Sequence, residues 1–238
     1  MHVRKSLIAA CILALVLVPL LTMSASVRYS KYAAASALGS RKIIYVIDPG
    51  HGGEDGGALS CTGVRESDLN LSVSHRLNDL LGLFGIPTRM TRTSDLSIYG
   101  PEAATVSEKK VSDLKNRVLL ANQTENAVLV SVHQNLFSES RYSGAQVFYA
   151  ETPGSRELAE ALQEALRQNL DPSNRRQAKK SLTVYLLKKI QVPGILLECG
   201  FLSNPEEESR LRDPSYQLRL ACVSAVCLCQ FRASASPA

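Results

Sequence analysis

Short, continuous apolar runs alternate along the chain with longer segments whose apolar residues recur at helical spacing. In residues 67–84, for example, Leu69, Val73 and Leu77 fall on one helix face, and Ser67 is a candidate N-cap. The continuous runs predict strands at residues 42–47, 86–92, 127–135, 145–150, 182–188 and 194–201. The periodic segments predict helices at residues 67–84, 111–123, 155–170 and 216–231.

The order of these elements predicts an α/β fold. Because strands alternate with helices, we expect three αβα layers: a mainly parallel, twisted sheet of about six strands with helices on both faces. In such sheets the reactive groups lie beyond the carboxyl ends of the strands. The polar segment 93–108, which contains Gly100-Pro101 and has no apolar period, is predicted to be a functional loop.

The N-terminal residues predict export of the rest of the chain. Basic residues at positions 2–5 precede an uncharged run from Leu7 to Met23, close to the shortest apolar segment, roughly 17 residues, that crosses a bilayer. Small residues follow, so the pattern fits a cleaved secretory signal and an uncleaved anchor equally well. The predicted organisation is a signal peptide or N-terminal membrane anchor at 1–26, a linker at 27–40 and a catalytic domain at 41–234.

Charge and composition exclude few partners but do not favour nucleic acid. The chain has a formal net charge of +5, which suits an anionic surface or polymer and is too small and too scattered to indicate nucleic-acid binding. The basic group Arg175, Arg176, Lys179 and Lys180 is a candidate contact with an anionic polymer or a protein partner. A solvated loop beside a helix end explains it equally well.

The cysteine pattern favours buried thiols over disulfides. Beyond Cys11 in the N-terminal run, an odd number of cysteines without paired spacing does not indicate a disulfide framework. Cys222 and Cys229 are spaced to share an apolar helix face, where cysteine behaves as a small hydrophobic residue. A metal site at Cys227 and Cys229 lacks a second pair of ligands.

Candidate metal ligands follow two of the predicted strands. His51 lies on the glycine-rich loop after residues 42–47, and His133 lies near the end of residues 127–135. Two imidazoles and one carboxylate form a typical catalytic zinc shell, with a further position left for water or substrate. Glu66 is the best oxygen donor, although the helix dipole alone explains a carboxylate there. The loop residues Glu54 and Asp55 are alternatives, and mid-helix His75 is expected to be a surface or packing residue.

Glu198 is a candidate catalytic carboxylate within the apolar strand 194–201. An unpaired ionised carboxylate in such a place costs several kcal/mol, so it is expected to be paired, to face a metal or to be catalytic. Near zinc it would take a proton from water and pass it to a leaving amine, whereas a salt bridge to an arginine such as Arg92 would be purely structural. Asp48 is a candidate acceptor for a ligand histidine or a loop cap, and Cys199 should point away from Glu198.

The motifs "IDPGHGGEDGGA…GVRE", "TR…D", "SVHQN…SGAQVFY" and "PGILLECGFLSNPEE" together resemble the zinc-dependent N-acetylmuramoyl-L-alanine amidases of the amidase-3 type. The resemblance covers about residues 42–232. It is greatest to the germination-specific subgroup of spore-forming bacteria, through "DLKNRVLLANQ", "LRQNLDPSNRRQAKK" and "VYLLKK". The chain departs from the common pattern at Leu136, where many members have alanine, and at Cys199.

The resemblance implies that His51, Glu66 and His133 hold Zn²⁺ and that Glu198 is catalytic. The implied substrate is peptidoglycan, cut at the amide between the muramic acid lactyl group and L-alanine, as a step toward muramic-δ-lactam in the spore cortex. We expect the N-terminal segment, or an activating membrane or lipoprotein partner, to localise the exported enzyme at the cell wall or cortex. The alternatives are a vegetative cell-separation amidase, a zinc peptidase that cuts stem peptides, and a catalytically inert wall-binding protein.

Overall fold

Six strands form one sheet in the part of the chain that the computed structural model describes, residues 43–234. The expected signal or anchor at 1–26 and the linker at 27–40 lie outside the described residues. The strands are β1 (Ile44–Pro49), β2 (Thr88–Met90), β3 (Ala127–Asn135), β4 (Gln146–Tyr149), β5 (Lys179–Lys180) and β6 (Gly194–Phe201). The helices are α2 (Glu66–Leu83), α3 (Val106–Gln123), α4 (Ser155–Asn169), α5 (Tyr185–Lys189), α6 (Pro205–Arg212) and α7 (Pro214–Ser234).

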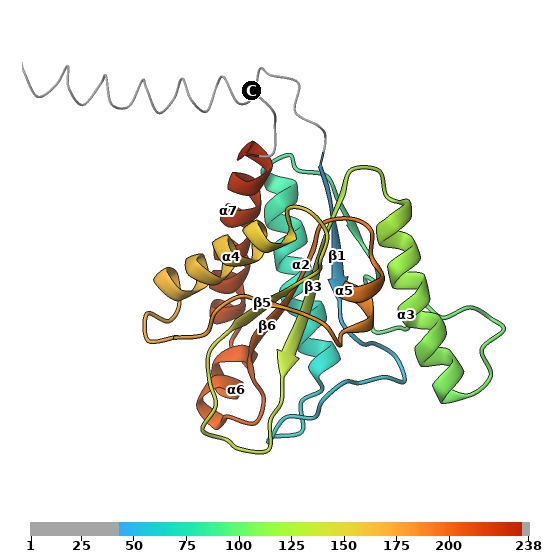
Figure 1. Cartoon of the computed structure of the whole chain (residues 1–238). Helices are drawn as coiled ribbons and strands as arrows, with labels where there is room; N and C mark the ends of the chain where they lie inside the picture. The colour runs from blue at the N-terminus through green and yellow to red at the C-terminus, as the bar shows by residue number, and fades with distance from the viewer. Residues whose placement is uncertain (1–42, 235–238) are drawn as a thin grey trace, which may run out of the picture. The chain divides into compact units, whose positions relative to one another are not determined.

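The sheet is mainly parallel, as the sequence predicts. Its strand order is β2-β1-β3-β6-β4-β5, and only the β4–β6 pair is antiparallel. The central strands β1, β3 and β6 run the same way, so their carboxyl ends meet at one edge (Figure 1). The residues that follow β1 and the last residues of β3 and β6 therefore lie together at this edge of the sheet.

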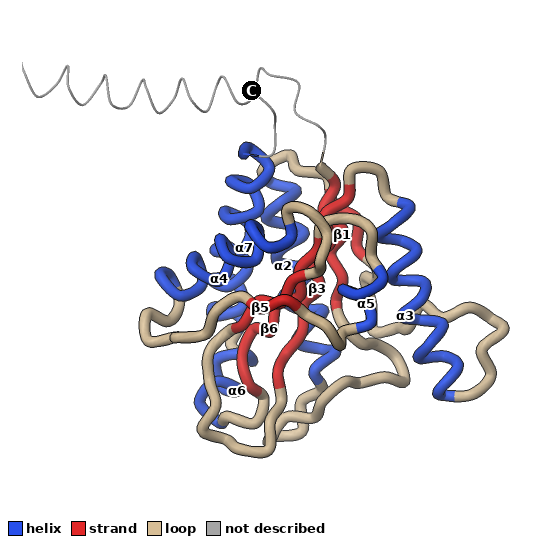
Figure 2. Tube along the Cα trace, in the orientation of Figure 1, coloured by secondary structure: helices blue, strands red, loops and turns tan. Residues whose placement is uncertain are grey.

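Helices cover both faces of the sheet (Figure 2). Side chains of β6 alternate between two apolar clusters: Ile195 and Leu197 pack with α2, α4, α6 and α7, whereas Leu196 packs with α3 and α5. The same alternation runs through β3, where Val130 and Leu129 belong to opposite clusters. Both faces of the central strands are therefore buried, which explains why their sequences are continuously apolar.

The prediction of a strand at residues 182–188 is wrong, because most of that segment belongs to α5. Leu186, Leu187 and Ile190 are buried at helical spacing against one face of the sheet, whereas Leu182 is 70% exposed. A short apolar run does not distinguish a strand from one helical turn. The sixth strand is instead β5, two exposed lysines that pair with β4 at the sheet edge.

Two helix starts also differ from the prediction, and each has a capping residue. Helix α3 begins at Val106, inside the predicted loop, because Thr105 Oγ1 accepts from Glu108 N and Glu108 Oε2 accepts from Thr105 N. The unpredicted helix α6 follows Asn204, whose side chain accepts from two backbone amides of its first turn. The sequence contains both capping signals, but neither helix start has a strong apolar period.

The described cysteines are all free thiols. Cys199 and Cys227 are buried, as expected, but Cys61 and Cys222 are exposed, so the buried-thiol prediction is wrong for those two. Cys199 belongs to the apolar cluster that contains α2, whereas Leu196, two residues before Glu198 in β6, belongs to the cluster on the opposite face of the sheet. Because residues two apart in a strand share a face, Cys199 points away from Glu198, as predicted. Among residues 43–234, no helix combines the length and hydrophobicity needed to cross a bilayer.

Candidate metal centre

The loop after β1 places His51 at the carboxyl edge of the sheet in a strained backbone conformation. His51 has a φ of 61°, in the left-handed region that side-chain-bearing residues seldom adopt. Glycines make room around it. A Cβ atom at Gly50 would lie 2.2 Å from Nε2 of His133, and one at Gly57 would lie 2.7 Å from Glu66 Oε2. The glycine-rich loop is thus packed directly against the candidate ligands.

Two buried arginines hold this loop by its carbonyl oxygens. Arg92 donates from Nε to the Pro49 carbonyl (2.9 Å) and from Nη2 to that of Gly50 (3.0 Å). Arg117 donates from Nη1 to the Pro49 carbonyl (2.7 Å) and from Nη2 to that of His51 (2.8 Å). These bonds fix the backbone on both sides of the imidazole. The suggested salt bridge between Arg92 and Glu198 is therefore not formed.

Asp48 completes the support of the loop instead of binding a histidine. Its carboxylate accepts from Thr91 Oγ1, Ser131 Oγ and Arg117 Nη1, each at 2.7 Å. Burial alone would raise the pKa of Asp48, but the charge of Arg117 and the two hydroxyl bonds outweigh burial and lower it. Asp48 is thus an ionised, fully buried anchor, and the suggestion that it is a histidine acceptor is wrong.

We expect Arg117→Met to lower the free energy of unfolding at pH 7 by about 3–5 kcal/mol, because it leaves Asp48 buried without its cation. The pKa of Asp48 is lower in the folded than in the unfolded chain. Its ionisation therefore stabilises the fold above the unfolded value of 3.8, and this stabilisation is lost as the pH falls through the lower folded value. Urea unfolding measures this effect. The difference in free energy of unfolding between the unmodified chain and Arg117→Met should be smaller at pH 3 than at pH 7. Arg219→Met, at an exposed arginine of α7, should change stability little.

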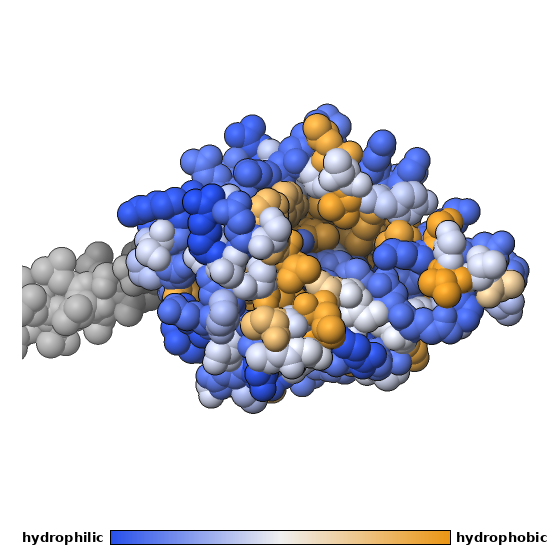
Figure 3. Space-filling view, turned by 90° about the horizontal axis from the view of Figure 1, so that it is seen from below, coloured by the Kyte–Doolittle hydropathy of each residue, from blue (hydrophilic) through white to orange (hydrophobic). Residues whose placement is uncertain are grey.

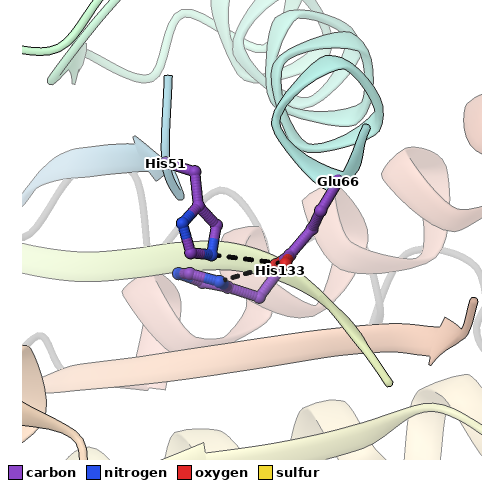
Figure 4. Close-up of side chains that lie close together, drawn as sticks. All are labelled: His51, Glu66 and His133. Carbon is purple, nitrogen blue, oxygen red and sulfur yellow. Dashed lines mark hydrogen bonds and ion pairs between the residues drawn. The ribbon is translucent and has the colours of Figure 1, made fainter. Parts of the chain in front are cut away.

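His51, Glu66 and His133 converge from the β1 loop, the first residue of α2 and the end of β3 (Figure 4). Glu66 Oε2 lies 3.3 Å from His51 Nε2, and Glu66 Oε1 lies 3.0 Å from His133 Nδ1. One potential ligand atom of each of the three residues lies within 4.8 Å of the others. Two imidazoles and a carboxylate at this spacing are a possible metal site.

The electrostatics of the cluster favour binding of a cation. Burial alone would lower the pKa of His51, but bonds to Asp55 and Glu66 raise it to about 9. The opposite balance holds for Glu66, whose pKa falls well below its usual range because the two histidines outweigh burial. His51 must lose a proton before it can bind a metal, so metal and proton compete for it.

Asp55, not Asp48, orients the ring of His51. Asp55 Oδ2 lies 3.0 Å from His51 Nδ1, which leaves Nε2 facing Glu66. The other loop candidate, Glu54, is bound to Lys109 at 2.7 Å. Neither loop carboxylate belongs to the three-residue cluster. Asp55 thus has the position of the carboxylate that commonly supports a metal-bound histidine.

We expect Asp55→Asn to weaken metal affinity by roughly 10- to 100-fold, because an amide does not hold the His51 ring as a carboxylate does. Competition with a calibrated chelator measures the change. Asp79→Asn, at an exposed carboxylate of α2, is the matched control and should leave the affinity unaltered. Equal affinities of the Asp55→Asn and unmodified chains would contradict the assigned role.

Glu66 is held by three further donors. Its Oε2 accepts from Ala58 N (2.9 Å), and its Oε1 accepts from Gln134 N (3.1 Å) and Asn70 Nδ2 (3.3 Å). Asn70 also donates to the Gly50 carbonyl, so one amide links α2 to the His51 loop. Sequence reasoning missed Asn70. The signal was its position four residues after Glu66, on the same helix face.

Glu198 lies beside His133 on the adjacent strand. The two residues are register partners in β3 and β6, so their side chains stand on the same face of the sheet. Among residues 43–234, no hydrogen-bond partner is found for the buried Oε2 of Glu198. Burial, with only partial compensation from His133, raises the pKa of Glu198 to about 7. A group with these properties is suited to proton transfer near neutral pH.

Glu198, His51 and His133 line one cavity of about 220 Å³. Its apolar walls include Leu114 of α3, Leu186 of α5 and Leu196 of β6, together with Val184, the residue before α5. Seen from below, the molecule is hollowed at its centre, with hydrophobic residues at the rim (Figure 3). The donor set, the orienting Asp55 and the unpartnered carboxylate oxygen together fit a catalytic metal.

His75 is not part of this site, because its Nε2 lies 3.0 Å from the Thr93 carbonyl oxygen.

Comparison with known proteins supports this description. The model of the Amidase_3 family, N-acetylmuramoyl-L-alanine amidase, matches residues 45–227. The chain is 40% identical over 183 residues to the germination-specific N-acetylmuramoyl-L-alanine amidase of Bacillus subtilis (strain 168), covering 76% of each chain. The CwlD amidase from Clostridioides difficile, solved in complex with the GerS lipoprotein, superposes with a TM-score of 0.76 and 36% identity, over 80% of this chain and 98% of that one. The amidase AmiC2 of Nostoc punctiforme superposes with a TM-score of 0.69 and 30% identity, over 81% of this chain and 98% of that one.

Proposed function

The chain belongs to the Amidase_3 family of N-acetylmuramoyl-L-alanine amidases, and from this premise we propose that it works with a zinc ion held by His51, Glu66 and His133. Its substrate is peptidoglycan, cut between the lactyl group of N-acetylmuramic acid and L-alanine. The proposed role is in the formation of spore-cortex muramic-δ-lactam. The observation that carries the proposal is the convergence of two imidazoles and a carboxylate beside an unpartnered Glu198.

Each residue of the site has a distinct part in the proposed reaction. Bound zinc would polarise the lactyl carbonyl and supply a water that is acidic near neutral pH. Glu198 takes a proton from the attacking water and returns it to the L-alanine nitrogen as the C–N bond breaks. The products are a lactyl carboxylate and a stem peptide with a free amino terminus. Asp55 keeps His51 in the orientation that this arrangement needs.

The proposed setting is the outer side of the membrane. The relatives include a germination-specific amidase, which supports a role in sporulation over vegetative cell separation. The CwlD neighbour was solved in complex with a lipoprotein, which supports a lipoprotein partner for this chain. We expect such a partner to activate the enzyme. The N-terminal segment, by cleavage or by anchoring, would complete the export that the proposal requires.

Mass analysis of digested peptidoglycan tests the proposal. The purified chain, stripped of metal and then reloaded with zinc, should release intact stem peptides that begin with L-alanine only after reloading. Shortened peptides would instead identify a zinc peptidase, and absence of products in both states would identify an inert wall-binding protein. The timing of expression during growth and sporulation separates the cortex role from the vegetative one.

A further inference from the structure

A basic groove lies between α4 and the segment 174–178, on the far side of β4 from β6. We call it the basic groove and define it by its four arginines, Arg156, Arg167, Arg175 and Arg176. Its volume is about 460 Å³.

Two of the four arginines are neutralised within the basic groove and two are not. Arg156 pairs with Glu160, and Arg167 pairs with Glu164, both at 2.8 Å. Within the described residues, Arg175 makes no hydrogen bond or ion pair. Arg176 bonds only to neutral acceptors. The groove therefore keeps two positive charges available to an anionic ligand.

Arg176 is held rigidly in place. Its Nε donates to the Ser143 carbonyl (2.8 Å), its Nη1 donates to Gln146 Oε1 (3.1 Å), and its guanidinium lies 4.4 Å from the ring centre of Phe201. Among the described residues, its Nη2 has no hydrogen-bond partner. A guanidinium fixed by neutral acceptors and an aromatic ring loses little conformational freedom when a carboxylate binds.

The segment that carries both arginines is equally well fixed. Buried Asn174 donates from Nδ2 to the Ala145 carbonyl (2.8 Å), and its Oδ1 accepts from Arg176 N (2.9 Å). A Cβ atom at Gly144 would lie 2.7 Å from Asn174 Oδ1, so the segment is packed closely against the start of β4. The basic groove is therefore a preformed feature of the fold.

The sheet connects the basic groove to the active site. Glu198 is the register partner of His133 in β3 and of Gln146 in β4, so the three side chains form a row on one face. Gln146 accepts the bond from Arg176. Adjacent strands lie about 4.8 Å apart, and each extended peptide residue spans up to roughly 3.5 Å. A peptide of a few residues that starts at Glu198 therefore reaches Arg176.

We propose that the basic groove binds a carboxylate of the stem peptide, through Arg175 and Arg176, while the scissile amide lies at Glu198. The inference rests on the proposed amidase function and extends it to substrate selection. Stem peptides carry carboxylates on residues beyond L-alanine, and these become neutral when they are amidated. The enzyme thus distinguishes peptides with free carboxylates from amidated ones by charge.

Kinetics with two matched muropeptides test the inference, one with free stem-peptide carboxylates and one fully amidated. Arg175→Gln should raise KM for the free-carboxylate substrate about fivefold and leave kcat unchanged, as expected for an exposed charge pair. For the amidated substrate neither constant should change. The same variant should fold normally, because Arg175 is exposed and makes no hydrogen bond or ion pair with the described residues. Arg219→Gln, at an exposed arginine of α7, removes the same charge elsewhere and should match the unmodified chain.

Arg176→Gln should give the same substrate-dependent rise in KM, with an unfolding curve recorded to confirm that it folds. Unchanged KM in both groove variants, or an equal rise on the amidated substrate, overturns the inference. Failure of the proposed function looks different, because the unmodified chain would then release no L-alanyl peptide from either substrate. In that case cosedimentation with insoluble peptidoglycan still tests the inference. If Arg175→Gln binds peptidoglycan as strongly as Arg219→Gln does, the inference is overturned. Weaker binding by Arg175→Gln supports it.

Discussion

Glu198→Gln should lower amidase activity by roughly 10²- to 10⁴-fold while leaving the metal content unchanged. Glutamine keeps the size of the side chain but cannot take a proton from water. Because Glu198 lies outside the His51–Glu66–His133 cluster, its replacement should not release the ion. The buried Oε2 has no hydrogen-bond partner among residues 43–234, so the neutral amide should not destabilise the fold. Activity on muropeptides and metal analysis of the same preparation measure both effects.

The same substitution at Glu66 provides the contrast. Glu66 lies within 3.3 Å of both histidine rings, so Glu66→Gln should lose metal and activity together. If the Glu198→Gln variant loses its metal, Glu198 is a ligand rather than a proton carrier. Glu198→Gln with unmodified activity would remove the residue from the reaction altogether.

The sequence predicts the central strands best, because their burial on both faces produces long apolar runs. The predicted bounds 127–135 and 194–201 match β3 and β6. Those strands place His133 and Glu198 as register partners, so two candidate residues come together from the sheet alone. The prediction fails for α5, where the apolar residues of one helical turn have the composition of a strand.

The surroundings of the site are less predictable, since they depend on backbone turns and on contacts between distant segments. Asp48 and Asp55 lie on either side of His51 in the sequence, and the left-handed turn at His51 decides which one reaches its ring. Arg117 reaches the loop from α3, and nothing in the composition of that helix identifies its target. The basic groove likewise unites α4 with a distant segment, so only half of its arginines stand out as a sequence cluster.

Gly50→Ala should lower the affinity for metal about 100-fold, at least as much as the loss of a supporting residue does. Amidase activity should fall in parallel. The added Cβ would lie 2.2 Å from Cε1 and Nε2 of His133, a distance that forces the ring or the loop to move. The loop has little freedom to move, because Arg92 and Asn70 hold the Gly50 carbonyl. The imidazole must therefore shift, and with it one of the three candidate ligands.

Gly82→Ala is the matched control for this substitution. Gly82 is exposed within α2, and a Cβ atom there meets nothing within 4 Å. Alanine should stabilise the helix by roughly 0.5–1 kcal/mol and leave metal binding unaltered. Titration with zinc against a chelator and thermal unfolding of both variants give the comparison. If Gly50→Ala binds zinc as tightly as Gly82→Ala, the contact between the loop and His133 does not position the ligand, and the link from the glycine-rich motif to the metal centre is lost.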